Sequence, residues 1–183
     1  GAAAVLAQQP GAQLTGSIEA DHGLQALRPA RPCLAGQRWE WDGVAFEVLH
    51  PLAGGDAPAP RPPRPNTLSC VLRVVAAGAQ APSVLLVGDI EAAQEQALVA
   101  RGAALQADLL LVPHHGSKTS SSPALLEAVR PRTALVQAGY RNRFGHPAPD
   151  VLQRYRERNI RVVESSRCGA ATWVSVAPDA VAC

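Results

Sequence analysis

The chain has 183 residues, 47% of them hydrophobic and 17% charged, so it can bury one sizeable core and is expected to be globular. No apolar run approaches the length of a membrane-spanning helix. The net charge of +2 conceals an asymmetry, because residues 130–167 hold nine arginines against three carboxylates. Such a segment suits a polyanionic substrate and disfavours a small neutral one. The alternative is that Arg154, Arg156 and Arg158 form a solvated helix face.

The first predicted elements are a helix over residues 1–9 and a β-hairpin. Residues 38–41 and 44–49 alternate in polarity on either side of Asp42-Gly43, a dipeptide typical of tight hairpin turns. The Pro/Gly-rich stretch 51–65 then predicts a surface loop, since it suits neither a strand nor a helix.

Beyond this loop the pattern becomes an alternation of strands and helices. Ser122-Pro123 is typical of a helix start, because serine caps and proline tolerates the first helical position. The predicted segments are strands 68–76 and 83–87, helix 91–101, strand 108–112, helix 123–129, strand 133–137, helix 149–158, strand 160–163 and a closing strand 170–176 followed by a frayed tail. This order predicts an α/β fold in a single domain, residues 1–183.

The four cysteines show no C-x-x-C spacing, which argues against a structural zinc knuckle. Cys70 lies in an apolar run and is interpreted as a free, buried core residue. Cys33 and Cys168 both lie in loop-like sequence and are the candidates for pairing in an oxidising compartment.

Polar side chains follow three of the predicted strands, at the point where each strand ends. Asp89 follows one strand, the run Val112–Thr119 (V-P-H-H-G-S-K-T) places His114 and His115 after the next, and His146 follows the third. Because the carboxyl ends of parallel strands meet at one edge of a sheet, we expect these residues to converge there. The sequence therefore predicts a metal or phosphate site at this edge.

Several short motifs occur in a fixed order along the chain. They are Asn66-x-x-Ser69-x-Val71-Leu72, Leu85-Leu86-Val87-Gly88-Asp89-Ile90-Glu91, Pro113-His114-His115-Gly116-Ser117, Pro131-x-x-Ala134 and Asn142-x-Phe144-Gly145-His146-Pro147. The set resembles the carboxyl-terminal metallo-β-lactamase-like domain of the ComEC family, the bacterial DNA-uptake proteins of natural transformation. The resemblance implies an αβ/βα four-layer sandwich, two divalent metal ions (Zn or Mn) and cleavage of the DNA strand that is not imported.

The same resemblance implies the surroundings of the domain. Its partners would be DNA and the membrane channel portion of the same full-length protein, with no organic cofactor. It would lie outside the bilayer on the outer, periplasmic face of a bacterial inner membrane.

Two metal ions assist phosphodiester cleavage by activating water and stabilising developing charge. Asp89 is the expected bridging ligand and His114 a terminal ligand. His115 is expected to orient a neighbouring group or contact substrate, and His146 to bind metal or donate a hydrogen bond to phosphate. The predicted phosphate contacts are Asn66, Ser117, Lys118, Arg141, Asn142 and Arg143. The alternative for Asp89 is a helix cap, that for Asn66 is a turn residue, and His50 is interpreted as structural.

One departure from the family pattern concerns the H-x-H-x-D-H motif, which supplies most metal ligands in such hydrolases. The nearest string, Ser17–His22, keeps only the final Asp-His. We expect the motif to lie upstream of Gly1, so that the 183 residues hold half of the metal site. The alternatives are a non-catalytic DNA-binding module of the uptake channel, or a related phosphodiesterase or esterase.

Overall fold

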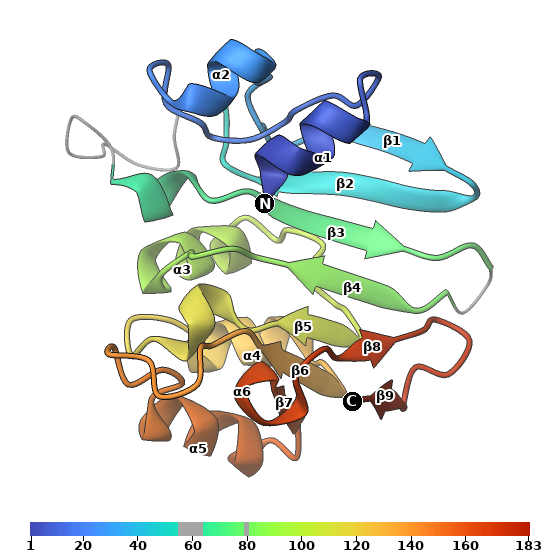
Figure 1. Ribbon diagram of the computed structural model, residues 1–183. Helices are drawn as coiled ribbons and strands as arrows, with labels where there is room; N and C mark the ends of the chain where they lie inside the picture. Colours follow the sequence, from blue (N-terminus) through green and yellow to red (C-terminus); the bar gives the residue numbers. More distant parts are fainter. Residues whose placement is uncertain (55–63, 79–80) are drawn as a thin grey trace.

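The computed structural model describes residues 1–54, 64–78 and 81–183. Seven strands form one sheet in chain order (Figure 1): β1 (Arg38–Trp41), β2 (Val44–His50), β3 (Val71–Val75), β4 (Ser83–Leu86), β5 (Leu109–Leu111), β6 (Thr133–Val136) and β7 (Arg161–Glu164). Strands β1 to β4 pair antiparallel, whereas β4 to β7 pair parallel. The predicted α/β class is thus confirmed as a mixed sheet with helices.

The helices of the second half begin close to where the sequence predicts them. Ser122 caps its helix by accepting a hydrogen bond from the Leu125 backbone N–H. The helices are α1 (Ala2–Gln8), α2 (Gly23–Leu27), α3 (Ala92–Ala100), α4 (Pro123–Val129), α5 (Pro149–Glu157) and α6 (Ser165–Cys168), with short 3-10 turns at Pro65–Leu68 and Pro113–Gly116. Within the described ranges, no helix is long and apolar enough to cross a lipid bilayer.

The predictions for the proline-rich loop and for the end of the chain have different outcomes. Most of the predicted loop 51–65 lies outside the described residues. The closing strand is wrong in extent, because only β8 (Thr172–Trp173) is extended and it pairs antiparallel with β9 (Val181–Ala182). The tail therefore returns to a small second sheet where fraying was predicted, and the bond Cys168–Cys183 ties it to α6.

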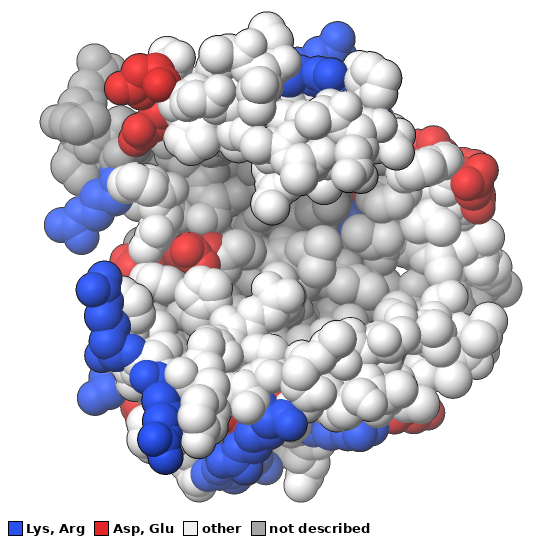
Figure 2. All heavy atoms as spheres, viewed as in Figure 1, with Lys and Arg blue, Asp and Glu red and all other residues white. Residues whose placement is uncertain are grey.

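The two faces of the seven-stranded sheet are buried to different degrees. Leu85 and Leu110 point to the face covered by α3, α4 and α5, and they belong to the main core. On the opposite face Leu72 pairs with Leu86, which keeps 37% of its surface exposed. Half-buried apolar residues continue across that face at Leu72, Val74, Val84, Leu111 and Leu135. Figure 2, which has the same view as Figure 1, shows that the surface is hollowed over this part of the sheet.

The disulfide bonds join partners other than the pair considered from sequence. Cys33 bonds to Cys70, with their Cα atoms 6.0 Å apart, and Cys168 bonds to Cys183, with Cα atoms 4.9 Å apart. The expected pairing of Cys33 with Cys168 is wrong, because the fold brings each to a different partner. The interpretation of Cys70 as a free buried thiol is also wrong, since it is half-buried and bonded.

A buried carboxylate holds the segment that leads from the β5 end into α4. Glu95 on α3 is fully buried and accepts hydrogen bonds from the backbone N–H groups of Ser121 (2.6 Å) and Ser122 (2.7 Å). Burial raises the pKa of the Glu95 carboxyl, while these hydrogen bonds and Arg154 oppose the rise. Arg154 donates to the Ser121 carbonyl (3.1 Å), and the Tyr155 hydroxyl lies 3.0 Å from Ser121 Oγ. Arg154 thus helps to hold this segment. The interpretation of Arg154 as part of a solvated helix face did not include this contact.

Replacing Glu95 by alanine should lower the free energy of unfolding by about 3 kcal/mol, because the buried Ser121 N–H and the partly buried Ser122 N–H lose their acceptors. Gln96→Ala is the control, since Gln96 is exposed on the same helix. Urea unfolding of both variants measures the difference. Equal stability of the two variants would contradict a structural role for the Glu95 carboxylate.

Candidate metal and phosphate site

The predicted site residues lie at three consecutive strand ends. Asp89 follows β4, His114 and His115 follow β5, and His146 lies in the loop between β6 and α5. The alternative of Asp89 as a helix cap does not hold, since Glu91 occupies the cap position of α3. The backbone N–H of Asp89 donates to Ser69 Oγ at 3.2 Å, which ties the β4 end to the segment before β3.

The two adjacent histidines sit in an unusual backbone turn. His114 and His115 have φ values of 48° and 56°, in the left-handed region that costs about 1–2 kcal/mol per non-glycine residue. Gly116 follows with φ +82°, and a Cβ there would meet the Pro147 Cα at 3.0 Å. The Gly116 carbonyl also accepts from the Ala148 N–H at 2.9 Å. The turn is therefore packed directly against the loop that carries His146.

His115 and Asp89 face each other in a way that favours a cation between them. Nδ1 of His115 lies 2.6 Å from the Gln137 carbonyl oxygen, which only accepts, so Nδ1 carries the hydrogen. In the neutral ring Nε2 then carries a lone pair and can only accept a hydrogen bond or bind a metal. It lies 3.5 Å from Asp89 Oδ1, which is also an acceptor. Two facing acceptors repel unless a proton or a metal ion lies between them. This arrangement adds His115 to the candidate ligands.

His114 and His146 form the other half of the cluster. Their rings lie 6.0 Å apart, and Nδ1 of each is buried without a hydrogen bond to any described residue. His114 Nδ1 lies 3.4 Å from Glu91 Oε1. Burial, followed by the nearby imidazoles, lowers the pKa of His146, and Asp89 opposes this. The lowered pKa favours the neutral His146 ring, in which one nitrogen keeps its lone pair.

Sequence reasoning did not include Glu91 in the site. The available signal was its position two residues after Asp89, at the start of the predicted helix. The donor types present, imidazole and carboxylate, are those that bind Zn or Mn. Within the described ranges, no group of three or more His, Cys, Asp or Glu side chains is placed to hold an ion by itself.

The first predicted phosphate contacts lie beside the cluster. Asn66 Nδ2 donates to Glu91 Oε1 at 3.4 Å, so the segment before β3 reaches the site across the sheet edge. Ser117 is buried and its hydroxyl lies 3.1 Å from that of Thr119, whereas Lys118 is exposed. Lys118 is thus open to an incoming anion, and the Ser117 hydroxyl is engaged within its own turn.

The other predicted contacts lie in the loop before α5. The Asn142 amide accepts from the His146 N–H (3.0 Å) and donates to the Gly139 and His146 carbonyls at 3.0 and 2.6 Å. Its side chain therefore braces the loop. Arg141 and Arg143 are exposed on either side of it. Figure 2 shows Lys and Arg side chains along the left and lower rim of this face, which Figure 1 places around this loop and α5.

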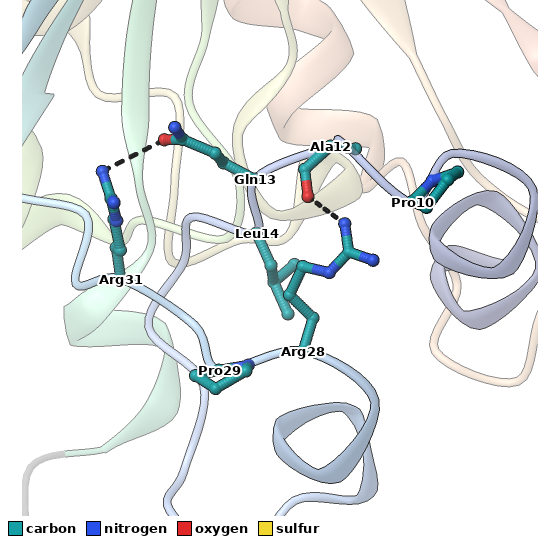
Figure 3. Close-up of a pocket in the computed structure, with 7 residues that line it drawn as sticks. All are labelled: Pro10, Ala12, Gln13, Leu14, Arg28, Pro29 and Arg31. Carbon is teal, nitrogen blue, oxygen red and sulfur yellow. Dashed lines mark hydrogen bonds between the residues drawn. The ribbon is translucent and has the colours of Figure 1, made fainter.

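A separate pocket lies near the N-terminus, and its lining residues are distinct from the cluster of His114, His115 and His146. Figure 3 shows its two arginines turned to oxygen atoms of Ala12 and Gln13, and its lining residues are Pro10, Ala12, Gln13, Leu14, Arg28, Pro29 and Arg31. Arg28 donates to the Ala12 carbonyl, and Arg31 lies 3.2 Å from Gln13 Oε1. These contacts join the segments around α1 and α2, and the pocket lining includes no histidine or carboxylate.

Comparisons with known proteins show which proteins this chain resembles. No known family model matches the chain. Over 166 residues it is 40% identical to competence protein ComA of Neisseria gonorrhoeae, covering 87% of this chain and 22% of that protein. This chain is related to competence proteins. It is also 37% identical over 140 residues to recombination protein 2 of Haemophilus influenzae and 36% identical over 130 residues to ComE operon protein 3 of Bacillus subtilis.

The shared region is a small part of each relative. The alignments cover 75% and 71% of this chain, but 16% of the Haemophilus and Bacillus proteins. With the Neisseria protein included, the alignments cover between 16% and 22% of the length of these three relatives.

The left-handed turn at His114 and His115 leads to a specific prediction about stability. His115→Gly should be more stable than His115→Ala by about 1 kcal/mol, because both lack the imidazole and only glycine accepts φ near 56° without strain. At ordinary positions the order is reversed. Paired urea unfolding curves measure this, and a more stable alanine variant would show that the turn is unstrained or has rearranged.

Proposed function

We propose that this chain is part of a metal-dependent phosphodiesterase that cuts DNA during uptake in natural competence. The observation that carries the proposal is the meeting of Asp89, His114, His115 and His146 at three strand ends, beside exposed arginines. The relation to competence proteins supports DNA as the polyanionic substrate. The degraded strand would be the one that is not imported.

Two metal ions, when bound, would supply an activated water and charge stabilisation at the phosphate. Asp89 would contribute a carboxylate ligand, His114 and His115 would each contribute an imidazole nitrogen, and the remaining ligands would come from the H-x-H-x-D-H motif that the family resemblance implies. The Gln137 carbonyl fixes the orientation of the His115 ring. The neutral His146 ring would donate its N–H to a non-bridging phosphate oxygen, and Lys118 would add positive charge.

Two features of the fold support the proposed family architecture and location. The half-exposed apolar face around Leu86 suits a second sheet packed against it, as the metallo-β-lactamase-like αβ/βα sandwich requires. All four cysteines form disulfides, which persist in oxidising surroundings such as the periplasm. We therefore propose that the domain lies on the outer side of the inner membrane, attached to the channel portion of its own full-length protein.

Asp89→Asn and His114→Ala in the full-length protein should each lower metal-dependent DNA cleavage by more than about 100-fold, since groups that only orient ligands already cost about 10- to 100-fold when mutated. Glu157→Gln neutralises an exposed carboxylate on α5 and is the matched control. The assay measures nicking of labelled DNA with and without added Mn or Zn, with circular dichroism to verify the fold. Cleavage by Asp89→Asn at the control rate would overturn the metal assignment.

The rival function is a non-catalytic DNA-binding module, which the exposed Arg141 and Arg143 would also serve. The same assay separates the two functions. A binding module would retain DNA without cutting it, whatever metal is added, and Asp89→Asn would leave its behaviour unchanged. A related esterase would instead cleave small phosphate esters faster than DNA.

A further inference from the structure

Two large aromatic side chains are exposed on the loop that carries His146. We call residues 139–147 the aromatic loop. Tyr140 and Phe144 keep 72% and 66% of their surface exposed, and neither belongs to the hydrophobic core. The folding of the domain gives no reason for two rings at one loop tip, because burial would stabilise each of them.

Each exposed ring carries an arginine beside it. The Arg141 guanidinium lies 5.2 Å from the Tyr140 ring centre, and that of Arg143 lies 4.8 Å from the Phe144 ring centre. Guanidinium planes and aromatic rings both stack on nucleobases, and the positive charge attracts the adjacent phosphate. The aromatic loop itself contains no carboxylate. Its composition thus combines base stacking with phosphate attraction.

The aromatic loop is held in shape before any ligand arrives. The Asn142 side chain bonds to backbone atoms of Gly139 and His146, at the two ends of the exposed tip. The contact between Gly116 and Pro147 fixes the base of the loop against the histidine turn. A ligand that stacks on such a loop loses little affinity to ordering of the protein.

The loop also connects the exposed rings to the proposed reaction centre. The Phe144 ring stacks beside that of His146, with ring centres 5.8 Å apart and planes 18° apart. The His146 ring centre is in turn 6.0 Å from that of His114. A base stacked on Phe144 would therefore place its own phosphate next to the histidine cluster.

We propose that the aromatic loop binds unpaired bases, so that the site takes single-stranded or frayed DNA in preference to paired duplex. This rests on the proposed function. In a duplex the bases stack on one another and only phosphates are accessible, so arginines alone would not distinguish the two forms. Exposed rings do distinguish them, because only an unpaired base offers a free face.

The test measures binding of the chain to a labelled oligo-dT strand and to a blunt duplex of the same length, by fluorescence anisotropy without divalent metal. Tyr140→Leu and Phe144→Leu keep an apolar side chain but remove the ring. Each should weaken binding of the single strand by about tenfold and leave duplex binding unchanged. Phe144→Trp should restore strand binding. Trp41→Leu is the matched control, since Trp41 is 70% exposed on a distant hairpin.

Strand affinity that is unchanged in both leucine variants would overturn the proposal and would point to a protein partner for the rings. Equal losses for strand and duplex would also overturn it, because they would indicate a phosphate or folding role. Cleavage is not part of this measurement. If the full-length protein fails to cut DNA while the ring-dependent strand preference holds, the catalytic proposal fails alone.

Discussion

The close approach of Gly116 to Pro147 sets the relation between the two loops that carry the histidines. A side chain at Gly116 would collide with Pro147 backbone and ring atoms, and the Gly116 carbonyl receives the Ala148 N–H. The left-handed conformation of His114 and His115 turns the chain so that this contact forms. Strained non-glycine residues of this kind persist where surrounding structure holds them, and they are concentrated at functional sites. The turn, its strain and the neighbouring loop thus form one unit.

Buried polar contacts from α3 and α5 hold the segment that follows this turn. Glu95 fastens the segment after the turn by two backbone hydrogen bonds, and Arg154 and Tyr155 of α5 bond to the same segment. The helix that follows the aromatic loop therefore also braces the segment that follows the His114 turn. Pre-organised groups lose less free energy when a phosphate or an ion arrives, which is what a catalytic or binding site at strand ends requires.

The sequence predicted much of this arrangement because its signals are local. Hairpin chemistry at Asp42-Gly43 and the cap at Ser122 located their elements closely, and strand ends brought Asp89 and the histidines together. Features that depend on contacts distant in sequence were not predictable. Disulfide partners follow from the packing of separate segments, and the burial of Glu95 depends on where α4 lies. The ligand-like lone pair of His115 depends on the Gln137 carbonyl, which no motif marks.

The most direct test of the central contact is the NMR signals of the imidazole groups in Gly116→Ala, compared with Gly102→Ala. Gly102 also has a positive φ of +64°, but no described atom lies within 4 Å of an added Cβ there. The structure predicts that the ring signals of His114 and His146, two of five histidines, shift in Gly116→Ala and stay in place in Gly102→Ala. Unshifted His146 signals in a folded Gly116→Ala protein would contradict the dependence of the site on this contact.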